Sequence, residues 1–439
     1  MLPVVIIGLG VSGLGCALEL AQHRIPFAGF EKEARPGGLA KSEDAGGFRF
    51  DYGPHILVGA PAGLEGLFRD LPGLDLKVCS GSSGVVMDAR LERVIPVPFQ
   101  RHLNWLPLDV RVRLLFEALA DRRNGKAPGS YPEYATARCG RGVYDLFLRR
   151  YDEKRLRFNL DEIPAEWTNR IEKTPLHSLV LPRVLADWFG RRNGESRFLY
   201  PRSGGIEALP RAMARLLPAN SVTYGCEVTG IHAQSKAAWF ANGAEVRYER
   251  LVLSLPLPET VSLIRDAPPE VLRAAEDLIH TSIYVVSFGL EGAVPPWSLL
   301  RVPGEEWGFY RLSFPSHYAP GAAPEGHSAV VGEISHHRAR YPLSARDARK
   351  ELQKGLEGLG ILRRGQRIVV ETMRDIRYGH VLYNHRTRAS MRVILDYLRS
   401  HSILVCGKYG AWKDMPIPES IQSGMAAARE TVGARSREG

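Results

Sequence analysis

The start of the chain constrains its fold more than any other part. Pro3 to Ile7 is a short apolar run rich in β-branched residues, which is typical of a buried parallel strand. The run leads into Gly8, Gly10 and Gly13, which have the G-x-G-x-x-G spacing, and residues 14–23 continue with a helical pattern. A strand, a glycine-rich turn and a helix in this order predict a Rossmann-type unit that binds a dinucleotide.

Each glycine has its own physical reason in such a unit. Gly8 permits the tight turn, Gly10 lets backbone approach a pyrophosphate, and Gly13 lets the helix pack close to the strand. The helix N-terminus adds N–H groups and a positive dipole for the phosphates. A second apolar run ends at Glu31, where an acid is expected to bind ribose hydroxyls. An ordinary glycine-rich turn is the alternative, but the agreement of all these elements favours dinucleotide binding.

Length and composition describe a globular chain of one large or two entwined domains. It has 439 residues, of which 44% are hydrophobic and 24% charged. A transmembrane helix is not expected because no run of eighteen apolar residues occurs, and the N-terminus does not resemble a signal peptide. The five cysteines are scattered and form no C-x-x-C pair, so we expect no metal site, reduced thiols and a cytoplasmic location.

The chain is basic, with 58 Lys and Arg against 48 Asp and Glu and a formal net charge of +10. A basic balance favours anionic partners. The excess is spread along the chain, mostly as arginine, and no recognition motif accompanies it, so no nucleic-acid role is expected. Two interpretations stay open: a site for a phosphorylated substrate, or an arginine-rich composition without functional meaning. The oligomeric state is undetermined.

The rest of the pattern predicts a discontinuous α/β nucleotide domain with two insertions. The domain would use residues 1–75, 205–265 and 395–435. Residues 76–204 have a mainly helical pattern and would form a substrate or lid region, with an amphipathic helix at 111–122. Residues 266–394 would form an antiparallel-sheet substrate region.

The segment from Arg35 to Ser42 indicates which dinucleotide is bound. Its sequence, R-P-G-G-L-A-K-S, resembles the second fingerprint of FAD enzymes in the amine oxidase and protoporphyrinogen oxidase superfamily. In these relatives the loop passes over the pyrophosphate and the ribityl chain of the flavin. The resemblance implies a flavoprotein with two dinucleotide-binding domains, of which the Rossmann-like one holds FAD. Nothing resembles a flavin-attachment motif, so non-covalent FAD is expected.

A closer resemblance starts at Gly53-Pro54-His55-Ile56, which is similar to the G-P-H-I motif of UDP-galactopyranose mutases. Other segments resemble the eukaryotic-type branch of these enzymes, and the similarity is collinear from residue 4 to about 430. They include residues 97–100, 142–154, 197–205, 309–320 and 407–413. The resemblance implies that N5 of reduced FAD attacks the anomeric carbon of a sugar or nucleotide sugar, which recloses with the other ring size. NAD(P)H is considered as the reductant.

The resemblance also implies roles for individual residues. His55 would lie beside the flavin ring, and Arg170 and Arg311 would bind a diphosphate, as catalytic residues. The expected cofactor-binding residues are Gly8, Gly10, Gly13, Glu31, Lys32, Gly37, Gly38, Leu39, Gly53, Pro54, His55, Val228, Gly407, Lys408, Ser420 and Ile421. The expected substrate-binding residues are Arg170, Arg311, Tyr310, Tyr383, His380 and Trp412.

Three departures from the mutase pattern leave the substrate open. His380 and Asp414 stand where mutases typically carry tyrosines, and an aspartate would repel a diphosphate. Lys408 keeps the charge of the usual arginine but lacks its fork. The rival function is an FAD-dependent oxidoreductase of the amine oxidase or protoporphyrinogen oxidase type, acting on a C–N, C–O or C–C bond of a small polar substrate. A flavin-stabilised binding protein is the third possibility.

Overall fold

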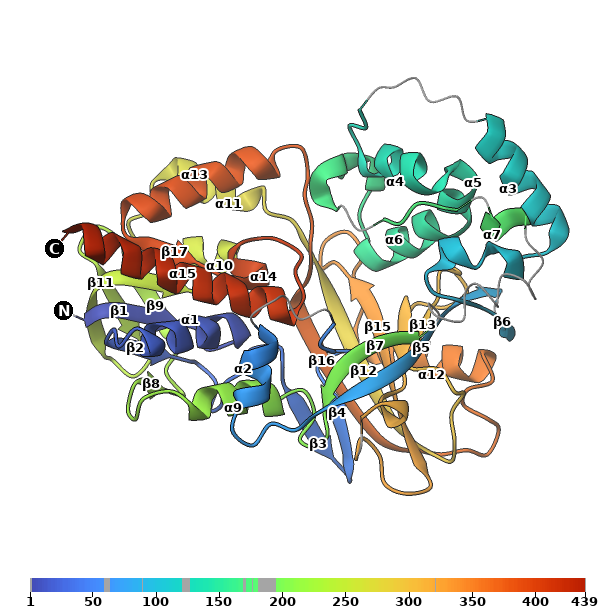
Figure 1. Ribbon diagram of the computed structural model, residues 1–439, viewed down its shortest axis with the longest axis horizontal. Coiled ribbons are helices and arrows are strands. Elements are labelled where there is room, and N and C mark those ends of the chain that lie inside the picture. Colours follow the sequence, from blue (N-terminus) through green and yellow to red (C-terminus); the bar gives the residue numbers. More distant parts are fainter. Residues whose placement is uncertain are drawn as a thin grey trace.

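The chain is described by a computed structural model that covers residues 2–58, 64–88, 90–120, 127–168, 171–175, 177–180, 195–319 and 321–438. Figure 1 shows three parts: a layered nucleotide domain around β1 and α1, a group of helices from α3 to α7, and a sheet of long strands that joins the two. Both termini lie in the nucleotide domain.

The nucleotide domain is built on a seven-stranded sheet. Its strand order is β8-β2-β1-β11-β10-β9, and β17 also pairs with β11. The central strand β1 pairs in parallel with β2 and β11, and Val4 to Ile6 are fully buried. The strands are β1 (Leu2–Ile7), β2 (Phe27–Phe30), β8 (Val222–Thr223), β9 (Val228–His232), β10 (Ala237–Phe240), β11 (Glu245–Leu253) and β17 (Ile403–Val405). They come from all three segments that the sequence assigns to this domain.

Helices cover this sheet on both faces, as the parallel pairing requires. α1 and α15 lie against each other, although they come from opposite ends of the chain (Figure 1). The helices of this domain are α1 (Val11–Gln22), α2 (Leu64–Asp70), α9 (Ala208–Arg215), α10 (Leu257–Leu263), α11 (Pro269–Glu276), α13 (Thr387–Ser400), α14 (Gly407–Gly410) and α15 (Ile417–Glu438).

The second sheet has eight strands in the order β16-β12-β15-β14-β13-β5-β6, with β7 on β5. Its pairings are antiparallel except for that of β13 with β5. Helix α12 (Ala345–Gly358) packs on one face through Leu352 and Leu356. The strands are β5 (Leu76–Asp88), β6 (Arg90–Pro96), β7 (Glu195–Pro201), β12 (His280–Glu291), β13 (Leu299–Arg301), β14 (Arg311–Ser313), β15 (His327–His336) and β16 (Ile368–Val381). A separate hairpin pairs β3 (Ser42–Ala45) with β4 (Phe48–Asp51).

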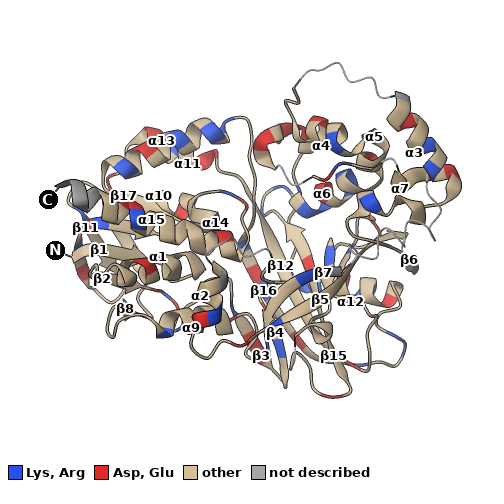
Figure 2. Cartoon of the chain, viewed as in Figure 1, with Lys and Arg blue, Asp and Glu red and all other residues tan. Residues whose placement is uncertain are grey.

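The helical part stands over one end of the second sheet (Figure 1). It contains α3 (Leu108–Ala120), α4 (Tyr131–Cys139), α5 (Arg141–Val143), α6 (Arg149–Leu156) and α7 (His177–Val180), with a π-helical stretch at Tyr144–Leu148. Acidic and basic side chains are interspersed along exposed helices such as α3 and α13 (Figure 2). Among the described residues, no helix is long and apolar enough to cross a bilayer.

One part of the predicted layout is wrong. Residues 76–96 and 195–201 were expected within the helical insertion, but they form β5, β6 and β7. The reason is tertiary pairing. Strand β5 pairs antiparallel with β7 and in parallel with β13, and both partners lie more than a hundred residues further along the chain. Within β5 and β6, Val85, Val86, Val94 and Ile95 are buried in two different cores, one on each face of the sheet.

Candidate active site

The two glycine-rich loops pack backbone to backbone at the carboxyl end of β1. Gly10 and Gly37 form a parallel bridge, and a Cβ on Gly38 would lie 3.2 Å from the Cα of Gly10. A Cβ on Gly13 would lie 1.9 Å from the carbonyl oxygen of Gly8, so α1 could not approach the turn with any larger residue there. The glycines therefore keep backbone exposed for a closely bound pyrophosphate, as the spacing predicts.

Glu31 lies beside the glycine turn, at the end of β2. It is buried, and its two carboxylate oxygens accept hydrogen bonds from the backbone N–H groups of Leu9 (2.7 Å) and Glu33 (3.0 Å). Each oxygen can accept a further bond, so the carboxylate can still take a ribose hydroxyl. Lys32 is exposed beside it. Val228 begins β9, two residues after a backbone N–H that donates to the carbonyl of Glu31.

The C-terminal helix α15 packs against α1, close to the glycine turn. Gly407 has a φ of +81°, and its N–H donates to the hydroxyl of Ser423 at 3.0 Å. A Cβ on Gly424 would lie 1.8 Å from the carbonyl oxygen of Ser12, so this glycine lets α15 touch α1. Other residues predicted to bind the cofactor are buried or half-buried: Ser420, Ile421, Pro54 and Leu39.

The His55 loop lies directly over the second sheet. Gly53 has a φ of +103°, and a Cβ there would come within 3.8 Å of both the imidazole of His55 and a carboxylate oxygen of Glu333. Burial lowers the pKa of His55 to about 4, so its ring is neutral at pH 7. Nδ1 lies 3.1 Å from the carbonyl of Gly53, which can only accept, so Nδ1 carries the proton and Nε2 is an acceptor.

A hydrogen-bonded chain of four side chains starts beneath this loop. The guanidinium of Arg311 binds the carboxylate of Glu333 through two N–H groups, one of them at 2.7 Å. The hydroxyl of Tyr310 donates to the same carboxylate at 3.1 Å, and His380 Nε2 lies 3.2 Å from the hydroxyl oxygen. Since that hydroxyl proton points to Glu333, His380 donates to Tyr310. Burial lowers the pKa of His380 well below its ordinary value, so this ring too is neutral.

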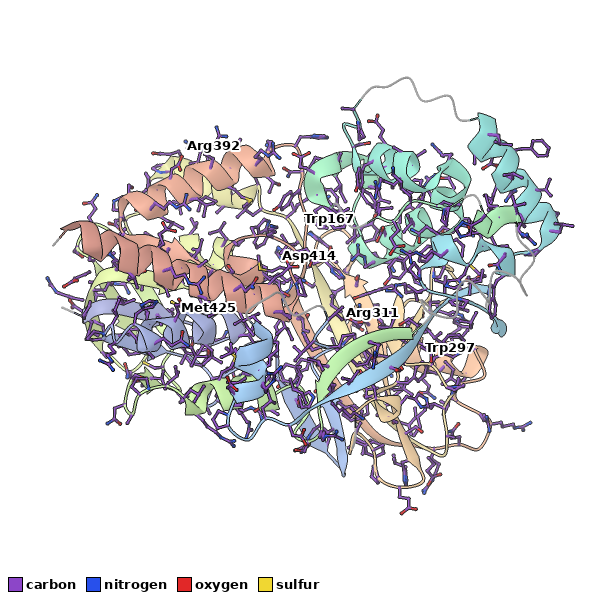
Figure 3. All side chains as sticks on the ribbon, viewed as in Figure 1. Trp167, Trp297, Arg311, Arg392, Asp414 and Met425 are labelled. Carbon is purple, nitrogen blue, oxygen red and sulfur yellow. The ribbon has the colours of Figure 1, made fainter. Side chains whose placement is uncertain are left out.

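The helical part contributes a second group of charges. The guanidinium of Arg155 binds Asp152 at 2.8 Å and lies over the rings of Tyr151 and Trp167. The indole N–H of Trp167 donates to the carbonyl of Val381 at 3.1 Å, which ties the helices to β16. Figure 3 shows Trp167, Arg311 and Asp414 at the centre of the molecule, where its three parts meet.

The other residues at the predicted substrate side differ in their partners and in their burial. Lys408 pairs with Asp414 at 3.0 Å, so the negative charge of that aspartate is balanced by a neighbour. Tyr383 donates to the carbonyl of Trp412 at 2.8 Å. Trp412 itself is fully buried in the core of the nucleotide domain, and this burial leaves no exposed surface for a substrate. Arg170 lies outside the described residues.

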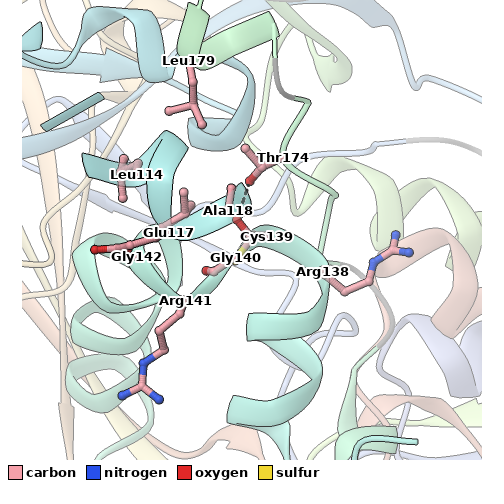
Figure 4. A pocket seen from close by; sticks show the side chains of 11 residues that line it. Leu114, Glu117, Ala118, Arg138, Cys139, Gly140, Arg141, Gly142, Thr174 and Leu179 are labelled. Carbon is pink, nitrogen blue, oxygen red and sulfur yellow. Dashed lines mark hydrogen bonds between the residues drawn. The ribbon is translucent and has the colours of Figure 1, made fainter. Parts of the chain in front are cut away.

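A separate hollow of about 140 Å³ lies in the helical part, among α3, α4, α5 and α7 (Figure 4). It is lined by side chains such as Leu114, Glu117 and Arg141, and Cys139 borders it. Burial raises the pKa of the Cys139 thiol to about 12, so it is unsuited to nucleophilic chemistry at neutral pH. Within the described part of the chain, no group of three or more metal-binding side chains occurs.

Comparison with known proteins identifies the family. Residues 11–432 match the family described as flavin containing amine oxidoreductase. The chain belongs to this family. It is therefore an FAD-dependent flavoenzyme. The FAD-binding roles of the two glycine loops, Glu31 and the start of α15 stay predictions.

Solved structures that superpose on this chain confirm the predicted α/β fold. Reduced UDP-galactopyranose mutase superposes with a TM-score of 0.89 at 23% identity, over 99% of this chain and 96% of that one. A putative protoporphyrinogen oxidase from Exiguobacterium sp. 255-15 superposes with a TM-score of 0.76 at 15% identity, over 98% and 99%. These likenesses concern the fold.

A curated relative in sequence carries a different name. The zeta-carotene-forming phytoene desaturase of Myxococcus xanthus is 24% identical over 320 residues, which are 66% of this chain and 61% of the relative. The chain thus spans about three fifths of that protein's length.

Sequence reasoning missed Glu333, Arg301 and Arg155. The sequence carries a signal for two of them, Glu333 and Arg301. Glu333 interrupts the apolar run V-V-G-E-I in β15, and Arg301 interrupts L-L-R-V in β13. A charge inside an apolar strand is costly unless it is paired, so it marks either an internal ion pair or a site. Which of the two applies depends on partners from other strands, which the sequence does not show.

Proposed function

We propose that this flavoenzyme rearranges a polar, sugar-containing substrate with reduced FAD and without net oxidation, as a mutase or related isomerase. One observation carries the proposal: the side chains beneath the His55 loop are charged or hydrogen-bonding groups that are buried or half-buried. Arg311, Glu333, Tyr310 and His380 form one connected chain there. Such a surface suits a ligand with many hydroxyl groups.

The same surface argues against a long hydrocarbon as substrate. A polyene would remove these groups from water and return no hydrogen bonds, and each uncompensated polar group costs about 1–3 kcal/mol. The ion pair between Glu333 and Arg311 would persist, but a hydrocarbon would offer no hydrogen-bond donor to the acceptors His380 Nδ1 and His55 Nε2. Sugar hydroxyls can donate to both ring nitrogens.

Bound reduced FAD would supply the nucleophile, and the chain's own residues would hold the substrate. The neutral His55 offers an acceptor over the flavin side of the site. The Arg311–Glu333 pair fixes the hydroxyl of Tyr310, which in turn fixes the tautomer and the orientation of His380. This preorganisation would orient the sugar ring before reaction.

The test uses purified holoenzyme under anaerobic conditions, first oxidised and then reduced by dithionite or by NAD(P)H. A panel of nucleotide sugars is incubated with each form, and the products are separated by ion-pair chromatography. We expect a ring isomer from the reduced form only, with no consumption of reductant per turnover. Turnover that consumes reductant or needs oxidised flavin would reject the proposal.

The second candidate is an oxidoreductase that oxidises a small polar substrate. Two observations favour it: Arg311 and Lys408 already have carboxylate partners, and the curated relative is named a desaturase. The same experiment separates the two functions. An oxidoreductase substrate would bleach the oxidised flavin anaerobically, whereas a mutase substrate would leave its spectrum oxidised.

A further inference from the structure

A row of charged side chains crosses the second sheet on the face opposite α12. Arg301 on β13 lies directly across from Arg311 on β14, which lies directly across from Glu333 on β15. Their neighbours Leu300 and Leu312 point into the core under α12. Because successive strand residues point to opposite faces, the three charged residues share the face that carries the His55 loop.

This row is electrostatically unbalanced. Like charges directly across two strands destabilise a sheet, so Arg301 opposite Arg311 needs an explanation. Glu333 binds Arg311 through both of its oxygens, and Asp152 holds Arg155. Arg301 has the neutral hydroxyl of Tyr151 as its hydrogen-bonding neighbour, with the cations Arg311 and Arg155 close by.

One guanidinium nitrogen of Arg301 is left over. Nη1 is buried and makes no hydrogen bond to any described residue. The three arginines Arg155, Arg301 and Arg311 face two carboxylates, so one positive charge remains within this part of the described chain. A buried N–H group of a cation without a partner is costly, and a bound oxyanion would satisfy it.

We infer that Arg301 and the outer edge of Arg311 form a subsite for one oxyanion of the substrate, a phosphate or a carboxylate. The inference rests on the proposed function, because it takes the anion to be part of the polar substrate. It adds a residue that lies outside the predicted site, and it names the charge that the substrate must carry. A planar guanidinium suits either oxyanion because two parallel N–H groups match two oxygens.

The subsite can be tested by binding alone. Holoenzyme is titrated calorimetrically with inorganic phosphate and, separately, with glucuronate. The probe that binds more tightly shows whether the subsite prefers a phosphate or a carboxylate. Arg301→Met should weaken binding of the preferred probe by about 10- to 100-fold, as expected for a lost hydrogen-bonded charge pair. Arg301→Lys should lose less, since it keeps the charge without the fork.

Arg392 provides the matched control. It is an exposed arginine on α13, far from the row (Figure 3), and Arg392→Met should leave binding unchanged. The flavin content of each variant reports whether it folds. If Arg301→Met loses its flavin, the test depends on Arg301→Lys, which should bind the preferred probe more weakly than the wild type does. Binding of neither probe to the wild type, or wild-type binding by both Arg301 variants, would overturn the inference.

Failure of the subsite and failure of the proposed function give different results. Arg301-dependent anion binding with no product from any sugar would keep the subsite and reject the mutase. A ring isomer formed by an enzyme whose anion binding ignores Arg301 would keep the mutase and reject the subsite.

Discussion

Replacing Glu333 by glutamine should make the protein less stable but a better anion binder. The substitution keeps the shape of the side chain and an acceptor for the hydroxyl of Tyr310, but it leaves the charge of Arg311 without its partner. Breaking a buried ion pair from one side costs about 3–5 kcal/mol. Because the side chain of Arg311 is 26% exposed, solvent screens its charge, and we expect a smaller loss of about 2–3 kcal/mol. With an unfolding entropy of about 2 cal/mol/K per residue over 439 residues, that loss corresponds to a fall in Tm of about 2–3 °C.

The assay is thermal unfolding of the holoenzyme, paired with calorimetric titration by phosphate. Removing the negative charge raises the local positive excess, so phosphate should bind about 10-fold more tightly to Glu333→Gln than to the wild type. Glu371→Gln is the control, because it breaks an exposed pair with Arg349 and should cost less than about 1 kcal/mol. An unchanged Tm together with weaker phosphate binding would refute the argument that Glu333 balances the charge of Arg311 in this row.

Three further predictions concern other parts of the site. Gly13→Ala should abolish FAD retention, measured as the ratio of flavin to protein, because its Cβ would overlap the glycine turn. Burial lowers the pKa of His55 from 6.5 to about 4, so the unfolded chain binds a proton that the folded chain does not. Stability should therefore fall as the pH drops from about 6.5 to about 4, by at most about 1.4 kcal/mol per pH unit, and His55→Gln should flatten the profile of Tm against pH. Asp414→Asn should release Lys408 and tighten phosphate binding in calorimetry several-fold, by about 1 kcal/mol.

Each of these has a control and a contradicting result. Gly433→Ala adds a methyl group in open space on α15, so flavin retention should survive it, and equal loss in both variants would contradict the packing argument. His385 is exposed, and His385→Gln should leave the pH profile unchanged. Weaker phosphate binding by Asp414→Asn would mean that Asp414 positions Lys408 rather than neutralising it.

The close backbone packing at the glycine turn after β1 was predictable because its signals are local. A tight turn, a close helix contact and a backbone approach each require glycine at a fixed spacing, so Gly8, Gly10 and Gly13 can be read without tertiary information.

The predictions weakened where partners come from distant segments. Strand β5 was assigned to a helical region because its pairing with β7 and β13 depends on residues more than a hundred positions away. The predicted repulsion by Asp414 assumed an isolated charge, whereas Lys408 balances it. The substrate role predicted for Trp412 is untested, and its full burial in the core of the nucleotide domain argues against that role.

The sequence by itself determined the fold class and the glycine-rich turn after β1, since these depend on short motifs with backbone requirements. Only the tertiary structure decided how the charges of the substrate side are balanced. Arg301, Arg311 and Glu333 are separated by 10 and 22 residues along the chain, yet they stand side by side because strand register aligns them. Electrostatic balance is a sum over neighbours in space, so no single stretch of sequence could determine it.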